Sequence, residues 1–319
     1  MSVLSVRLFG RPSFQRGELT VSGIESRKVQ ELFCYLLISR NRPHPREALA
    51  SLLWSDRTTA VSKKYLRQSL WQLQSAINPL KEPTSRQVLT VDDDWVEINA
   101  EADLWLDVAA FERAFAEVVA AMPAVLNADS AQTLKNAVEL YQGDLLEGWY
   151  QDWCLYERER LQNMYLGILE RLVEYCESHH EYQAGQIYGS RILAVERAHE
   201  RTHRRLMRLH YLAGDRTTAL RQYKRCVATL EEDLGVEPSM STRILYEQIC
   251  NDRLDGRPPM SGSGEHPVAK PANATPETHN GPLVELLEHL KKLRTGLIDI
   301  ERQMQEDIRT VELTLRQRS

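Results

Sequence analysis

The sequence is poor in cysteine and has no long apolar run. Its five cysteines lie far apart and none forms a Cys-x-x-Cys pair, which argues against a zinc or redox site. Buried, reduced thiols are expected instead, as in a reducing cytoplasm. No apolar stretch approaches the ~20 residues that a membrane span needs, and residues 1–7 alternate in polarity, unlike the apolar core of a signal peptide. We therefore expect a cytoplasmic protein without a membrane partner.

Motifs for catalysis and for cofactor binding are also missing. The sequence has no Gly-x-x-x-x-Gly-Lys-Ser/Thr phosphate-binding loop and no nucleophile elbow. His199 and His203 stand four residues apart, a spacing that suits a metal, but no third ligand lies nearby. We expect these histidines on a polar, partly exposed helix face. The sequence thus predicts no enzyme, no cofactor and no metal site.

The net charge of −5 is unevenly distributed along the 319 residues. Residues 1–100 hold 14 lysines and arginines against 10 aspartates and glutamates, whereas residues 101–255 hold 17 against 26. A basic module next to an acidic one is typical of a polyanion-binding domain joined to a protein-binding domain.

The first hundred residues have the pattern of a winged helix-turn-helix domain. Short strands are expected at 5–10 and 18–21, followed by helices at 26–39, 46–54 and 58–78. Residues 41–45 read as a turn. Residues 88–98 then read as a β-hairpin with Asp92, Asp93 and Asp94 at its tip.

The third of these helices is the candidate DNA-reading element. Its apolar face has spacings of four, three and four: Leu66, Leu70, Leu73 and Ile77. Polar and aromatic side chains lie opposite or beside that face: Lys63, Lys64, Arg67, Gln68, Trp71 and Gln72. A DNA major groove accepts one α-helix, and such side chains read bases or bind phosphates there. An ordinary solvated helix face would show the same pattern.

Several sequence blocks in residues 1–255 have the pattern of a known family. In the first hundred residues these are VRLFG (6–10), RKVQELFCYLL (27–37), REAL to LW (46–54) and LRQSLWQL (66–73). Further blocks are GDLLEGW (143–149), LMRLHYLAGD (206–215) and LEEDLGVEPS (230–239). In these blocks the chain resembles the SARP-type regulators (Streptomyces antibiotic regulatory proteins), which join an OmpR-like winged helix to a tetratricopeptide-like bacterial transcriptional activation domain. The resemblance implies that the third helix is the recognition helix and that residues 56–62 contact RNA polymerase.

Two features depart from the family pattern. The family usually has arginine near the positions of Gln72 and Gln74, so the electrostatic share of DNA affinity should be lower here. The acidic hairpin tip should be repelled by phosphate. Either the hairpin stays clear of DNA, or the domain binds weakly until something else concentrates it.

Residues 101–255 read as a helical solenoid. Helical pairs joined at Gly or Asp turns recur about every 34–40 residues, and such pairs must stack to bury their apolar faces. One helix carries a basic band that either contacts phosphate or pairs with acidic neighbours: Arg201, Arg204, Arg205 and Arg208.

The C-terminal part divides into a linker and a coiled coil. Residues 256–282 are rich in Pro, Gly, Ser and Asn, as in a flexible linker. Residues 283–319 carry a narrow apolar stripe with the spacing of a coiled-coil seam: Leu286, Leu290, Leu293, Leu297, Ile300 and Met304. Because such a stripe needs a partner helix, we expect a homo-oligomer. Docking on another protein or on the solenoid is the alternative.

Three functions remain open from the sequence. The first is an activator that binds repeated half-sites in double-stranded DNA as an oligomer, with RNA polymerase as a partner. The second is a protein-interaction scaffold whose winged helix binds protein, and the third is a regulator gated by a small effector. The fold class is mainly α in each case: a winged helix-turn-helix at 1–100, a tetratricopeptide-like solenoid at 101–255 and a coiled-coil helix at the end.

Overall fold

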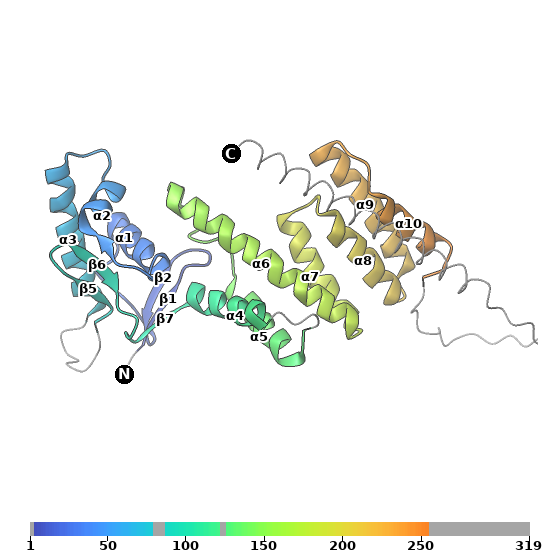
Figure 1. Ribbon diagram of the computed structural model, residues 1–319, viewed down its shortest axis with the longest axis horizontal. Helices are drawn as coiled ribbons and strands as arrows, with labels where there is room; N and C mark the ends of the chain where they lie inside the picture. The colour runs from blue at the N-terminus through green and yellow to red at the C-terminus, as the bar shows by residue number, and fades with distance from the viewer. Residues whose placement is uncertain (1–2, 79–86, 122–125, 255–319) are drawn as a thin grey trace, which may run out of the picture. The chain divides into compact units, whose positions relative to one another are not determined.

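The computed structural model describes residues 3–78, 87–121 and 126–254 (Figure 1). The N-terminal part has short strands and three helices: β1 Leu4–Arg7, β2 Ser13–Arg16, β3 Leu19–Thr20, α1 Arg27–Ile38, β4 His44–Pro45, α2 Arg46–Leu53, α3 Thr59–Ile77, β5 Leu89–Val91, β6 Trp95–Ile98 and β7 Leu104–Leu106. Helices follow: α4 Asp107–Ala121, α5 Ala128–Leu140, α6 Asp152–Ser178, α7 Tyr182–Val195, α8 Glu200–Leu212, α9 Arg216–Leu234 and α10 Met240–Cys250. The described part is therefore mainly helical, with a small N-terminal β region, as the sequence predicts.

Two small sheets frame the three N-terminal helices. In the first, with the order β3-β2-β1-β7, β1 runs antiparallel to β2 and parallel to β7. Val6 of β1 lies between Phe14 and Leu106 in register. The second sheet, β4-β6-β5, contains the wing hairpin, and its strand β4 includes His44, which pairs with Val96. The sequence pattern did not predict β2, β4 or β7.

The N-terminal helices pack through their apolar faces. In α1, Leu32, Phe33 and Leu36 are fully buried, because residues three and four apart share one face of a helix. Ser26 occupies the N-cap position of α1, but its side chain makes no capping hydrogen bond. Its main-chain carbonyl instead accepts a bond from the Gln30 amide, 3.0 Å away.

The helices from α6 to α9 form two stacked antiparallel pairs (Figure 1). The turn between α8 and α9 has Gly214 at φ +87°, a backbone conformation that glycine adopts without strain. Asp215 then caps α9 by accepting a hydrogen bond from the Thr218 amide at 2.9 Å. These pairs form the expected solenoid.

One apolar core runs through most of the described chain. A single cluster of buried side chains extends from Leu4 in β1 to Leu209 in α8, and a smaller one packs α8, α9 and α10 around Tyr211 and Ile249. Within the described ranges no helix combines the length and apolar character that crossing a bilayer requires.

The predicted linker and coiled coil lie outside the described residues. This applies to the whole proposed oligomerisation seam: Leu286, Leu290, Leu293, Leu297, Ile300 and Met304.

Candidate nucleic-acid interface

Helix α3 has one buried and one exposed face, as its periodicity predicts. Leu66, Leu70, Leu73 and Ile77 are at most 2% exposed and pack against the rest of the N-terminal core. Lys64, Gln68 and Trp71 lie on the other face and are exposed, and Trp71 reaches 70%. Tyr150 and Tyr156 are at least as exposed elsewhere on the chain, so the exposure of Trp71 by itself does not mark a binding surface.

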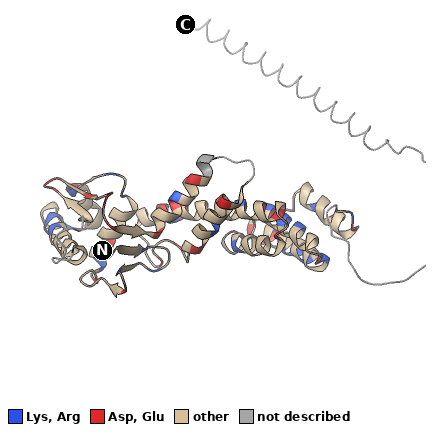
Figure 2. Cartoon of the chain, turned by 90° about the horizontal axis from the view of Figure 1, so that it is seen from below, with Lys and Arg blue, Asp and Glu red and all other residues tan. Residues whose placement is uncertain are grey.

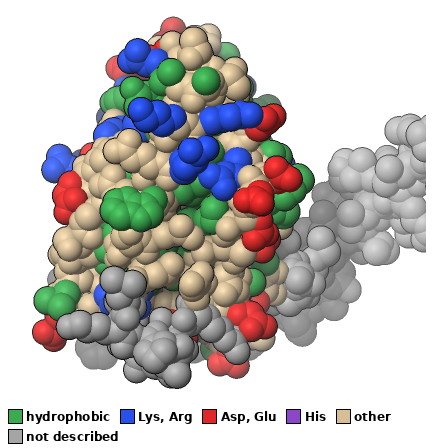
Figure 3. Space-filling view, turned by 90° about the vertical axis from the view of Figure 1, so that its left-hand side faces the viewer, with side chains coloured by type: hydrophobic (Ala, Val, Ile, Leu, Met, Phe, Trp, Pro, Cys, Tyr) green, Lys and Arg blue, Asp and Glu red, His purple; other side chains and the backbone are tan. Residues whose placement is uncertain are grey.

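The cations of α3 differ in their surroundings. Lys64 and Arg67 are exposed and form no ion pair with any described residue. Lys63 lies 2.5 Å from a carboxylate oxygen of Glu47 in α2. This hydrogen bond and the lysine charge lower the pKa of the Glu47 carboxyl. In Figure 3, basic side chains gather on the end of the molecule that carries α3, with acidic side chains beside them.

Gln72 makes a structural contact that its sequence position did not suggest. Its side-chain nitrogen donates a hydrogen bond of 2.9 Å to the carbonyl of Gly23, in the loop before α1. Gly23 has φ +95°, and a Cβ atom there would lie 3.3 Å from the Cβ of Ala76. The half-buried amide of Gln72 therefore holds a close approach between this loop and α3, unlike the open side chains of Lys64 and Gln68.

The acidic wing tip lies beside the N-terminal half of α3. Arg46 makes two hydrogen bonds to this tip. Its backbone amide donates to the carbonyl of Asp94 and its guanidinium donates to the carbonyl of Asp92, each over 2.9 Å. The side chains of α2, α3 and the tip enclose a surface depression of about 300 Å³. No sequence pattern indicated the roles of Arg46 and Glu47, because these depend on how α2 docks against α3 and the hairpin.

The winged helix is joined to the helical domain through main-chain and side-chain bonds. Phe9 forms an isolated antiparallel bridge with Leu145, and the Gly10 amide donates to the Asp144 carbonyl at 2.9 Å. The buried carboxylate of Asp107 accepts from the amides of Leu8 and Phe9 at 2.8 and 3.0 Å.

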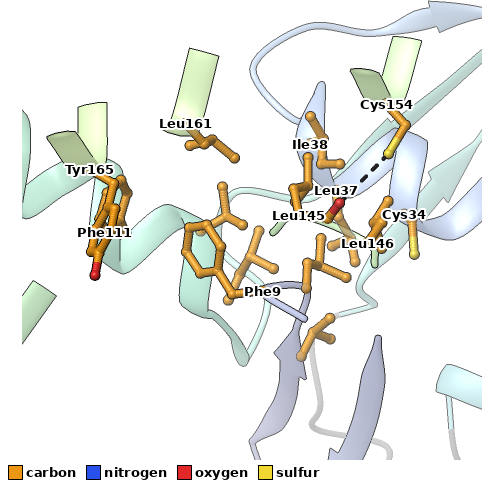
Figure 4. Packing of buried hydrophobic residues seen from close by; sticks show 14 of the residues in the cluster. Phe9, Cys34, Leu37, Ile38, Phe111, Leu145, Leu146, Cys154, Leu161 and Tyr165 are labelled. Carbon is orange, nitrogen blue, oxygen red and sulfur yellow. Dashed lines mark hydrogen bonds between the residues drawn. The ribbon is translucent and has the colours of Figure 1, made fainter. Parts of the chain in front are cut away.

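Apolar side chains from both domains meet at this junction. In Figure 4, Leu37 lies beside Leu145, and Phe9 lies between this pair and Phe111, whose ring centroid is 5.2 Å from that of Phe9. Arg27 of α1 stacks over the Trp149 ring, with 3.9 Å between its guanidinium carbon and the ring centroid. The position of α3 is thus tied to the helical domain.

Three of the four arginines of the basic band pair with carboxylates, whereas Arg204 contacts the hydroxyl groups of Ser241 and Thr242. Glu174 of α6 lies 3.1 Å from Arg201 and 2.5 Å from Arg205, and Arg208 lies 2.8 Å from Glu177. Basic and acidic segments interleave along these helices in Figure 2. Of the two alternatives from the sequence, the structure favours pairing with acidic neighbours.

Of the two histidines expected on a partly exposed face, His199 is partly exposed and His203 is not. His203 is only 2% exposed: one ring nitrogen lies 2.8 Å from the Arg197 carbonyl and the other 2.9 Å from the Gln222 amide nitrogen. Burial lowers the pKa of its imidazole. His199 lies 3.4 Å from Glu170. Among the residues described, no group of three or more potential ligands is placed to hold a metal ion.

Comparison with known families decides the nature of the helical part. Residues 106–250 match the family described as "Bacterial transcriptional activator domain". The match covers fewer than half of the 319 residues, and it shows what the helical part is similar to. The SARP-type resemblance seen in the sequence blocks is thereby confirmed, because a bacterial transcriptional activator domain follows a winged helix.

The solved structures give a relative with the same fold. Mycobacterium tuberculosis EmbR, in a structure titled as a complex with a low-affinity phosphopeptide, aligns with a TM-score of 0.66 and 20% sequence identity. The alignment covers 81% of this chain and 68% of that chain. The comparison with curated protein sequences finds no match. This likeness shows that the two chains share a fold.

Proposed function

We propose that this chain is a cytoplasmic, non-enzymatic activator of transcription that binds double-stranded DNA in a sequence-specific manner through α3. One observation carries the proposal: α3 presents Lys64, Arg67 and Trp71 to solvent, and neither cation forms an ion pair with a described carboxylate. Cations on an exposed helix attract phosphate, and in this proposal Gln68 and Trp71 contact base edges and the thymine methyl group.

The test is selection of bound duplexes from a random pool with the full-length chain, followed by affinity measurements on the selected sequence. Lys64→Ala and Arg67→Ala should each weaken binding about tenfold and flatten the salt dependence by about one phosphate contact. Lys224→Ala, which removes an exposed lysine of α9, is the matched control and should leave affinity unchanged. A chain that retains no duplex even at low ionic strength would refute the proposal.

The oligomeric part of the proposal rests on the sequence of residues 283–319. Two linked heads raise the effective concentration of the second DNA contact, by roughly 10²–10⁴ in avidity. Deleting residues 283–319 should weaken binding to a probe with two half-sites far more than to a probe with one. Equal loss on both probes would reject the avidity mechanism.

RNA polymerase is the proposed protein partner. The predicted contact segment, residues 56–62, comprises the turn before α3 and the first residues of that helix. Residues 56–61 are exposed, so a polymerase bound beside the operator can reach them, whereas Ser62 is buried. The scaffold function keeps one supporting observation, which is the acidic wing tip beside α3. Salt-sensitive duplex binding separates the two functions, because a scaffold would bind little DNA at any ionic strength.

A further inference from the structure

The depression between α3 and the wing brings three cations and three carboxylates together. Its lining comes from the first turn of α2, the N-terminal half of α3 and the hairpin tip: Arg46, Glu47, Lys63, Leu66, Arg67, Asp93 and Asp94. The cations converge from two helices on one volume of about 300 Å³, which is ample for a phosphate group.

Two of the three cations form hydrogen bonds to other groups of the chain. Lys63 donates to Glu47 at 2.5 Å, and Arg46 donates to the Asp92 carbonyl at 2.9 Å. Arg67 lines the same depression without an ion pair to any described residue. The geometry suits an anion, because all three basic residues line one depression.

The carboxylates that line the depression disfavour the binding of an anion there. The side chains of Asp93 and Asp94 are exposed, and neither forms an ion pair with a described cation. They lie within the ~10 Å over which charges interact at 0.1 M salt, since they line the same depression. The carboxylates thus offset the three cations, so that the local charge is close to zero.

We propose that this depression is a seat for one DNA backbone phosphate and that Glu47, Asp93 and Asp94 lower its affinity. The inference rests on the proposed function and adds a residue-level account of how tightly the chain binds. On binding, Lys63 exchanges the Glu47 carboxylate for a phosphate oxygen. Because exposed ion pairs contribute little to stability, breaking the pair between Lys63 and Glu47 costs little free energy. The wing carboxylates remain beside the phosphate and repel it.

The experiment uses the full-length chain, a mixed-sequence DNA duplex and titrations between roughly 50 and 200 mM salt. Glu47→Gln should raise affinity several-fold and steepen the slope of log affinity against log salt by about one contact. Asp93→Asn combined with Asp94→Asn should raise affinity by a similar factor, and the triple variant by about tenfold or more at the lowest salt. Asparagine keeps the turn preference of the tip.

A second pair of variants isolates the exchange at Lys63. Lys63→Ala should cost more affinity in the Glu47→Gln background than in the wild type, because only in that background is the lysine free before DNA arrives. Glu97→Gln is the matched control: it removes an exposed carboxylate from β6 of the same hairpin, outside the depression, and should change affinity little.

The outcomes separate the two proposals. If the wild type binds duplex but neutralising the three carboxylates leaves affinity and salt slope unchanged, the phosphate seat is overturned while DNA binding stands. If neither the wild type nor the triple variant retains duplex at the lowest salt, the proposed function itself fails. Thermal unfolding of each variant verifies that the fold is intact.

Discussion

The guanidinium of Arg158 donates hydrogen bonds to three main-chain carbonyls of one loop. It lies 3.0 Å from the carbonyls of Leu145 and Leu146 and 2.8 Å from that of Trp149. Leu146 has φ +49° and Gly148 φ +79°, so this loop adopts a conformation that the backbone does not favour by itself. A planar fork of donors is suited to hold several carbonyls at once.

Replacing Arg158 with alanine should therefore destabilise the protein by about 2–3 kcal/mol, because charged hydrogen bonds to half-buried carbonyls are lost. The measurement is the urea midpoint of the full chain. Arg160→Ala is the control on the same helix: its partners are Glu112 and Glu157 near the surface, so it should cost less than about 1 kcal/mol. Equal losses in the two variants would contradict the role of Arg158.

A second residue-level feature is the buried imidazole of His203. Its hydrogen bonds to the Arg197 carbonyl and the Gln222 amide fit a neutral ring that donates through Nε2 and accepts at Nδ1. Burial lowers the pKa of His203, and burial also lowers that of His210. The unfolded chain therefore binds protons more readily than the folded chain just below the ordinary histidine pKa.

It follows that stability is fully present above a pH of about 6.5 and falls as the pH drops below it. Chemical unfolding at a series of pH values measures this slope. His203→Gln should reduce the slope even though it also changes the absolute stability. A slope that is the same in the variant and the wild type between pH 5 and about 6.5 would rule out His203 as its source.

At the scale of elements, glycines set how closely α7 approaches α8. A Cβ atom on Gly189 would lie 2.7 Å from Cδ2 and 2.9 Å from Cγ of Leu206, which is itself buried. Gly167 of α6 differs, because a Cβ there would lie 3.7 Å from the nearest ring carbon of Phe115, an ordinary contact.

Alanine substitution at these two glycines should have opposite effects. Both changes gain up to about 1 kcal/mol of helix propensity, but overpacking against Leu206 costs about 1–3 kcal/mol. Gly189→Ala should therefore lower the free energy of unfolding, and Gly167→Ala should raise it slightly. Urea unfolding of both variants tests this, and a stabilised Gly189→Ala would mean that α7 can move away from α8 without cost.

At the scale of the whole described molecule, the winged helix and the activator domain share a core. The buried cluster runs without a break from β1 into α8, and Asp107 binds the amides of Leu8 and Phe9 across the junction. Such continuity predicts that the two domains unfold together.

Asp107→Ala should test this coupling. It leaves two buried amides without an acceptor, at a cost of about 3 kcal/mol. Fluorescence and far-ultraviolet circular dichroism should show one transition, shifted to lower urea in the variant. Two separate transitions, of which only one shifts, would show that the junction does not transmit stability between the domains.

The candidate site was only partly predictable from the sequence. The exposure of Lys64 and Arg67 followed from the leucine spacing of α3, because the helix period fixes which residues share a face. The contact of Gln72 with Gly23 and the pairing of Lys63 with Glu47 did not follow. Both join segments distant in sequence, so they depend on how α3 docks.

The strands show the same division. β7 is three residues long and pairs in parallel with β1, about a hundred residues earlier. No local periodicity marks so short a strand, and its partner lies outside any sequence window. Asp107, which follows β7 directly, reads in the sequence as an ordinary first-turn acid of α4, whereas in the fold it is buried at the junction.

The amino-acid sequence alone determined the succession of winged helix and helical repeats, and which face of α3 is open, because both follow from periodicities repeated over many residues. Tertiary structure decided which charges face each other. It brought Glu47 into an ion pair with Lys63 and Glu174 into an ion pair with Arg205. It also brought the acidic tip beside Arg67. The reason is physical: electrostatic interaction depends on distance in space, and only the packing of helices and strands sets that distance.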